Sequence, residues 1–304
     1  MLSFYEACIR QSKSAPLKVT IDLEGFSDWN DQHFLRTNST RLLTLFVEQT
    51  REHATRWKEF VWNHDRSLIT AQYFLEYLPQ ELPSLQRLTI NLHWDKLIER
   101  NQRQFPICPN LQTLSLIDIW DDNDEMEAAL FQKSEFLSVK SLLIGNGMAW
   151  MDIDFRYMAN FQNIHTLTLA SLSGDVICEC DATSPVNVPH LRLLRLRGRV
   201  PHKVLSLIIP PDNLTVVVED SDEPQSIDTL YGTGIAKEMT TLHVDWSESI
   251  SLSSAFELLK DASRLEAVYL SRQVEETLLG HKFEQFRADH GYSFSIYTGV
   301  VRVS

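Results

Sequence analysis

The sequence lacks the features that carry a chain across a membrane or fold it around disulfide bonds. Its 304 residues include four cysteines, which are scattered and do not form the paired framework of an extracellular repeat protein. No early apolar stretch follows a basic segment, and no run approaches the ~20 apolar residues of a transmembrane helix. These absences predict an intracellular protein, cytoplasmic or nuclear, with reduced thiols.

The sequence also lacks a recognisable catalytic, cofactor or metal motif. The glycines at Gly145 and Gly232 do not complete a dinucleotide-binding fingerprint. Cys178 and Cys180 offer only two metal ligands. In the acidic run at residues 118–127, a calcium loop starting at Asp121 would have Met126 and Gln132 where glycine and glutamate are needed. The prediction is therefore a protein that is not an enzyme and has no cofactor or metal site.

Basic residues are in short supply. Lysine and arginine number 28 against 41 aspartates and glutamates, which gives a formal net charge of -13. Because binding to phosphate backbones or anionic lipid needs a concentrated positive face, this charge argues against nucleic acid and membrane as partners. It favours a basic or neutral partner protein.

What the sequence does contain is one apolar pattern, LxxLxL, that returns at nearly constant spacing. The intervals between successive first leucines, here called anchors, are 26, 28, 25, 27, 23, 25 and 26 residues. These intervals fit a leucine-rich repeat, whose period is ~20 to 29 residues, and exclude the longer helical repeats. The anchors are Leu85, Leu111, Val139, Ile164, Leu191, Leu214, Met239 and Leu265, and Trp57 begins an additional aromatic copy.

The predicted fold is an α/β leucine-rich-repeat solenoid, in which a curved parallel sheet carries helices or irregular turns on its convex side. We expect a single domain that spans residues 1–304. It comprises an N-terminal cap (residues 1–53), the repeats (54–271) and a C-terminal cap (272–304). Helical spacing is expected at residues 204–207, 252–259 and 274–286, whereas residues 174–188 and 219–234 read as protruding loops.

Four stretches of the chain resemble the leucine-rich-repeat portion of the fungal F-box-like family, especially its mushroom-type members. They are APLKVTIDL (residues 15–23), HATRWKEFVW (53–62), LPSLQRLTI (82–90) and CPNLQTLSL (108–116). The resemblance implies a protein-binding role, because family members join a Skp1-containing ubiquitin ligase through the F-box and hold the substrate with the repeats. In that family the F-box would precede the equivalent of Leu2, and Met1 stands just after where it would end.

The sequence therefore supports two main functions. The first is a protein-interaction scaffold similar to the substrate-recognition half of an F-box protein, with Skp1 as a partner only if an F-box precedes this chain. The second is an orphan repeat module that acts as an adaptor or competitor outside any ubiquitin ligase. An enzyme is the remote alternative.

The candidate binding residues lie at the ends of the predicted strands. Tryptophans there either close the repeat turn as core residues or, beside carboxylates, form hot spots for a partner. Arginines after Leu191 either pair with neighbouring carboxylates or bind an acidic or phosphorylated segment. The predicted set is Trp94, Asp95, Trp120, Asp121, Asp122, Asp124, Trp150, Arg195, Arg197 and Trp246.

Equal positions in adjacent repeats should be neighbours in the sheet. Arg197 and Asp220 each stand six residues after their anchors, Leu191 and Leu214. We therefore expect Arg197 to lie beside Asp220. Between the leucines, the intervening strand residues should line the concave face, including Val216, Val218, His243 and Tyr269.

Overall fold

The structure is a computed structural model of the whole chain. It describes residues 8–22, 48, 51–63, 78–91, 106–117, 136–146, 158, 160–171, 185–198, 200–219, 226–244, 252–270, 276–291 and 293–298. The chain divides into two compact units, Met1–Val139 (unit 1) and Lys140–Ser304 (unit 2). Both are α/β units built on parallel strands, and the expected single domain between two caps remains a prediction.

Unit 1 contains four described strands that pair in chain order, and each of these pairings is parallel. Glu59 lies opposite Arg87, and Arg87 lies opposite Thr113, so the register repeats the anchor spacings of 28 and 26 residues. The strands are β1 (Leu17–Asp22), β2 (Trp57–Asn63), β3 (Arg87–Asn91) and β4 (Thr113–Ile117), and the 3-10 turn η2 (Ala54–Arg56) leads into β2.

The anchors form the core of unit 1. Trp57, Leu85 and Leu111 are fully buried, as expected for inward-facing residues of stacked repeats. On the far end of the strands the Asn91 side-chain amide donates to the Asn63 side-chain carbonyl oxygen at 2.7 Å. Asparagine bonding between neighbouring repeats, which the sequence mostly lacks, is therefore present between β2 and β3.

The start of the chain is attached to the repeats by one arginine. The guanidinium of Arg56 donates to the Ala15 carbonyl oxygen at 2.8 Å and to the Ser12 hydroxyl at 2.6 Å. Since Arg56 directly precedes the first anchor, the segment before β1 is tied to the first aromatic repeat.

Unit 2 contains seven described strands in one sheet, again paired in chain order and parallel to one another. Ser141, Thr166 and Leu193 lie opposite one another, which reproduces anchor spacings of 25 and 27 residues. The strands are β5 (Ser141–Asn146), β6 (Thr166–Ser171), β8 (Leu193–Arg197), β10 (Leu214–Glu219), β11 (Met239–Val244), β12 (Ala267–Leu270) and β13 (Ser295–Thr298).

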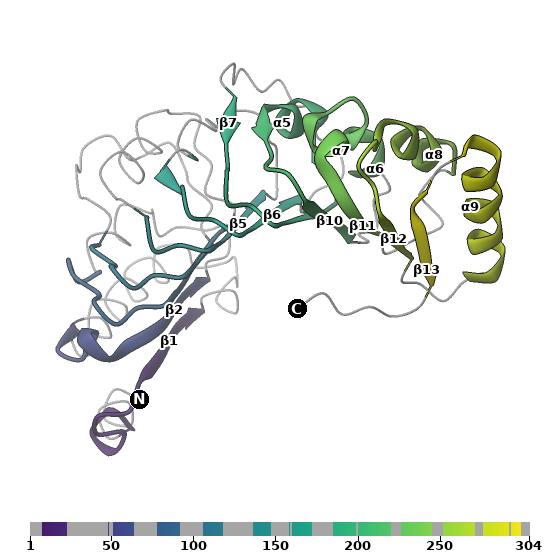
Figure 1. Cartoon of the computed structure of the whole chain (residues 1–304). Coiled ribbons are helices and arrows are strands. Elements are labelled where there is room, and N and C mark those ends of the chain that lie inside the picture. The colour runs from purple at the N-terminus through teal and green to yellow at the C-terminus, as the bar shows by residue number, and fades with distance from the viewer. Residues whose placement is uncertain are drawn as a thin grey trace, which may run out of the picture. The chain divides into compact units, whose positions relative to one another are not determined.

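The helices of unit 2 lie on one side of this sheet, with α9 beside β13 (Figure 1). Their inward residues, such as Val204, Leu230 and Leu258, are fully buried. The described helices therefore leave the other side of this sheet uncovered. The helices are α5 (His202–Leu207), α6 (Ser226–Leu230), α7 (Gly234–Glu238), α8 (Leu252–Asp261) and α9 (Glu276–His290), so the helical spacing predicted at residues 204–207 and 252–259 is confirmed.

The register of β10 differs from the prediction by one residue. Thr215 lies opposite Leu193, and Glu219 rather than Asp220 lies opposite Arg197. The pairing of β10 with β11 has the predicted spacing of 25 residues at Leu214 and Met239, and then shifts by one residue so that Thr215 lies opposite Thr241. The backbone accommodates this shift at Asn213, whose φ of 66° lies in the left-handed region that asparagine tolerates better than most residues. The prediction that Asp220 pairs with Arg197 is therefore wrong by one residue.

Two predicted loops contain regular structure. Within residues 174–188, β7 (Val186–Asn187) pairs with β9 (Ile208–Ile209) in a small second sheet. Within residues 219–234, α6 buries Ile227 and Leu230. The turn that follows α6 uses Gly232 at a φ of 75°, and its backbone N–H donates to an Asp261 carboxylate oxygen at 3.0 Å. The described parts of both segments therefore pack against the unit.

Among the described residues, no helix has the length and apolar character needed to span a membrane.

Candidate partner-binding surface

Most of the predicted site falls outside the part of the chain that the structure describes. This applies to eight residues: Trp94, Asp95, Trp120, Asp121, Asp122, Asp124, Trp150 and Trp246. The two interpretations of the tryptophans, core residue or hot spot, therefore both stand. Arg195 and Arg197 are described, and both lie on β8 in unit 2.

The side of the unit 2 sheet that no described helix covers, here called the open face, consists of the strand residues that alternate with those packed on the helix side. Along β8, Leu194 and Leu196 are buried, whereas Leu193 and Arg195 are half-buried and Arg197 is exposed. Parallel pairing aligns such positions into rows across the sheet. The first row is Ser141, Thr166, Leu193, Thr215, Thr241, Ala267 and Ser295, and the second is Leu143, Thr168, Arg195, Val217, His243, Tyr269 and Tyr297.

The predicted concave residues mostly belong to these rows, with one correction. Val216 and Val218 are buried on the helix side, because the one-residue offset of β10 exchanges its two faces. Thr215 and Val217 take their places on the open face. Thr168 and Val217 belong to the open face, but each is only 7% exposed.

Two arginines and one glutamate form the charged part of the open face. Arg195 Nη1 donates to Glu219 Oε1 at 2.8 Å, and Arg197 Nε donates to Glu219 Oε2. The β8–β10 pairing places Glu219 opposite Arg197. Of the two interpretations of this arginine cluster, pairing with a neighbouring carboxylate thus describes Arg195 and Arg197.

These contacts hold the glutamate in its charged form. Burial alone would raise the pKa of the Glu219 carboxyl, but hydrogen bonds from Arg197 and Arg195 and their positive charges outweigh it. The pKa of Glu219 therefore lies below its usual range. The three residues together carry one net positive charge at neutral pH.

Beside this cluster, three aromatic side chains form a stacked ladder along the second row. The His243 and Tyr269 rings lie 4.4 Å apart between centroids with an interplanar angle of 5°, and the Tyr269 and Tyr297 rings lie 4.7 Å apart at 14°. Each residue occupies an equivalent position on β11, β12 or β13. Tyr297 is 48% exposed, so the ladder offers a large aromatic surface to solvent.

The histidine at the start of the ladder is held neutral. Burial lowers the pKa of His243, and the positive charge of Arg195 lowers it further. A neutral imidazole stacks on Tyr269 without the cost of burying a charge. At neutral pH the ladder is thus an uncharged aromatic strip next to an arginine-rich cluster.

The Glu219 contacts lead to a prediction about acid. Because its folded pKa is below the unfolded value of about 4.3, the carboxylate stabilises the fold above that pH, and the stabilisation disappears as the pH falls through the folded value. Glu219→Gln should therefore cost no more than about 1 kcal/mol at pH 7, since the pair is partly exposed to solvent. Urea unfolding in steps down to about pH 2.5 should show the two proteins converging. A difference that persists in acid would contradict this assignment.

Comparisons with protein-family models, curated proteins and solved structures found no match. The open face must therefore be interpreted from its own chemistry.

The described residues include no group of three histidine, cysteine, aspartate or glutamate side chains that could hold a metal ion. Cys8 and Cys108 are free thiols, and burial raises the pKa of the Cys108 thiol to about 12, which suppresses its thiolate. Cys178 and Cys180 lie outside the described residues.

Sequence reasoning missed Glu219, His243, Tyr269 and Tyr297 as members of one surface. His243 and Tyr269 were expected on the concave face, but nothing linked them to each other. The available signal was their equal position, four residues after the anchors Met239 and Leu265. Tyr297 lies in the predicted cap, where no anchor marks its register, so only the β12–β13 pairing places it third in the ladder.

Proposed function

We propose that this chain is a leucine-rich-repeat solenoid that binds a partner protein through the open face of unit 2 and has no enzymatic activity. The observation that carries the proposal is the ladder of His243, Tyr269 and Tyr297 on an uncovered sheet face. Aromatic side chains supply rigid contact area at low entropic cost and are enriched in interface hot spots.

The repeat type is supported by two facts that arise separately. The anchor spacing lies in the range of leucine-rich repeats, and successive strands pair in parallel at those spacings in both units, apart from the shift in β10. A fold of this kind leaves one strand face open for docking. The resemblance to the fungal F-box-like family favours the role of holding a substrate for a Skp1-containing ubiquitin ligase, inside the cell in cytoplasm or nucleus.

The second candidate is an orphan adaptor or competitor that works outside any ubiquitin ligase. The genomic reading frame before Met1 distinguishes the two functions. An in-frame F-box, together with co-purification of a Skp1-type adaptor with the longer protein, would support the ligase role. Its absence would support the orphan adaptor. Turnover of a substrate by the purified chain would overturn both.

The test of the open face uses two tyrosines of matched exposure. Tyr297 on the ladder is 48% exposed, and Tyr231 on the helix side is 50% exposed. Partners captured from native cells would be purified, and their dissociation constants measured against wild type, Tyr269→Ala/Tyr297→Ala and Tyr231→Ala. We expect the double variant to lose about 2 kcal/mol or more, roughly 30-fold in Kd, if the ladder is a hot spot.

The Tyr231→Ala control should bind like the wild type, because its ring lies away from the open face. Circular dichroism would establish that both variants remain folded. Equal affinity of all three proteins for every purified partner would contradict binding through the ladder.

A further inference from the structure

A second charged feature lies at the edge of the unit 2 sheet where the strands begin. Lys140, His165 and Arg192 each stand one residue after an anchor and directly before β5, β6 and β8. Their backbones are joined in sequence: His165 N–H donates to the Lys140 carbonyl at 2.8 Å, and Arg192 N–H donates to the His165 carbonyl at 2.8 Å. With about 4.8 Å between neighbouring strands, the three residues form a row about 10 Å long.

This basic row, together with His190, is open to solvent. Lys140, Arg192 and His190 are exposed, and His165 is half-buried. In the part of the chain that the structure describes, none of these four side chains forms an ion pair with a carboxylate. In a chain with a net charge of -13, such a group of unneutralised bases is unexpected.

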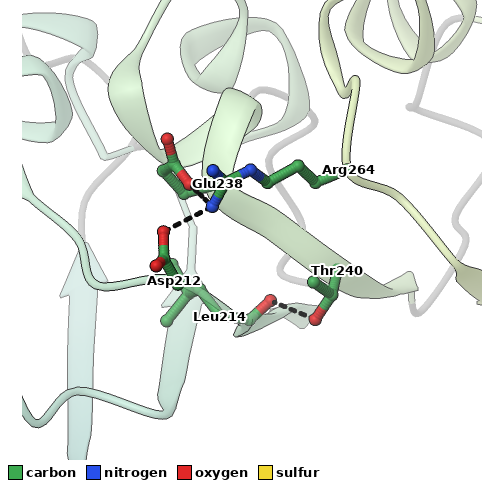
Figure 2. A network of polar contacts seen from close by, with 5 residues as sticks. All are labelled: Asp212, Leu214, Glu238, Thr240 and Arg264. Atoms are coloured by element: carbon green, nitrogen blue, oxygen red, sulfur yellow. Dashed lines mark hydrogen bonds and ion pairs between the residues drawn. The ribbon is translucent and has the colours of Figure 1, made fainter.

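Two carboxylates farther along the same edge are already engaged. Asp212 and Glu238 precede β10 and β11, and the Arg264 guanidinium binds both of them (Figure 2). The hydrogen bond and charge of Arg264 hold the pKa of the Asp212 carboxyl below its usual range. Asp212 and Glu238 are therefore paired with Arg264 and do not neutralise the basic row.

The electrostatic effect of the row is visible at its central residue. Burial lowers the pKa of His165, and the charges of Arg192, Lys140 and His190 lower it further. All of the charged groups that shift the pKa of His165 are positive. The row consequently has a local positive potential that a bound anion would relieve.

We infer that the basic row of Lys140, His165, Arg192 and His190 is a binding site for a phosphorylated serine or threonine in a partner protein. A phosphomonoester carries about -1.5 to -2 charges at pH 7 and three acceptor oxygens, which match two permanent cations flanking a histidine. The planar fork of Arg192 suits two of those oxygens. A nucleic acid or an anionic membrane presents many charges over a wide area, where the -13 net charge of the chain opposes binding.

This site is separate from the open face and does not depend on it. The ladder and the Arg195–Glu219 contact belong to the strands themselves, whereas the basic row precedes them. If the open-face experiment failed, the proposal for the basic row would still stand. If the phosphopeptide experiment failed, the proposal for the open face would still stand.

The experiment uses the full chain and two probes. The first is a degenerate nonapeptide library with a fixed central phosphoserine, compared with the same library carrying serine. The second is inorganic phosphate, titrated while the imidazole signals of His165 are followed by NMR. We expect the phosphorylated library alone to bind, and phosphate to raise the pKa of His165.

Three variants locate the site. Lys140→Gln and Arg192→Gln should each weaken binding of the phosphorylated library by about tenfold or more, as expected for loss of a hydrogen bond between charged groups. Lys237→Gln removes the same charge from an exposed position on α7 and should leave binding unchanged. Circular dichroism would check the fold of each variant.

Several results would overturn the inference. One is equal weakening by Lys237→Gln and Arg192→Gln, since the effect would then come from net charge alone. Another is equal affinity for the serine and phosphoserine libraries. Tighter binding of single-stranded RNA or of phosphoinositide vesicles than of the phosphopeptides would assign the row to another class of partner.

Discussion

Replacing Trp57 with alanine should lower the free energy of unfolding of unit 1 by about 3 to 5 kcal/mol, the usual cost of deleting a large buried aromatic side chain. Trp57 is the anchor of the aromatic repeat and is fully buried. Its ring stacks on Phe60 with centroids 5.3 Å apart and an interplanar angle of 7°. Truncation would leave a cavity beside Phe60 in the first layers of the core.

Trp57→Phe provides the matched comparison. The indole N–H of Trp57 is buried without a hydrogen-bond partner among the described residues, which costs stability in the wild type. Phenylalanine removes that donor while keeping most of the apolar volume. We therefore expect Trp57→Phe to cost less than about 1.5 kcal/mol.

Urea unfolding followed by far-ultraviolet circular dichroism measures both effects without relying on tryptophan fluorescence. Arg87→Ala, at an exposed position of β3, should change the unfolding free energy by no more than about 0.5 kcal/mol. A cost below about 1 kcal/mol for Trp57→Ala would show that this position is not a core anchor. A cost of Trp57→Phe well above about 1.5 kcal/mol would show that removing the unpaired indole N–H brings no gain in stability.

The parallel strands could be predicted because the anchors indicate both the buried side of each strand and its register with the next strand. An apolar residue at every anchor identifies the buried side, and the distance between anchors sets the strand register, as the pairs Glu59–Arg87 and Thr166–Leu193 show. Burial of Leu88 and Leu114 follows from the same alternation. Where the LxxLxL pattern is complete, sequence alone locates each strand.

The pattern fails where three valines stand in a row. Val216, Val217 and Val218 are all apolar, so their identities do not reveal which of them faces the core. A shift of one residue exchanges the faces of a strand, and the backbone conformation of Asn213 that produces this shift cannot be read from apolar spacing. Helix α6 could not be predicted from the sequence, because its five residues are too few to show a helical period.

The charged part of the open face shows how a one-residue offset changes the predicted contacts. The positions of Arg195 and Arg197 were predicted, but the valine offset places Glu219 rather than Asp220 beside them. The aromatic ladder was missed for a different reason. His243, Tyr269 and Tyr297 are separated by 26 and 28 residues, and only strand pairing brings their rings within stacking distance.

Removing residues 272–304, the predicted C-terminal cap, should make the protein aggregate. The deletion takes away β13 and leaves β12 as an unpaired edge strand, which is a template for association with other chains. It also removes Phe286, which stacks on Phe256 of α8 with centroids 4.3 Å apart and an interplanar angle of 4°. Apolar surface of the last repeat would then face solvent.

Two full-length variants separate the contributions of this segment. Phe286→Ala keeps β13 but removes the ring stacked on α8, so it should lower the unfolding free energy by about 3 to 5 kcal/mol without changing the oligomeric state. Tyr297→Ser changes β13 only on the open face and should leave the oligomeric state unchanged. Size-exclusion chromatography with light scattering reports the mass of each protein, and urea unfolding reports its stability. If the truncated chain proved monomeric, folded and as stable as the wild type, residues 272–304 would not be a cap, because neither the edge of β12 nor the buried face of α8 would need covering.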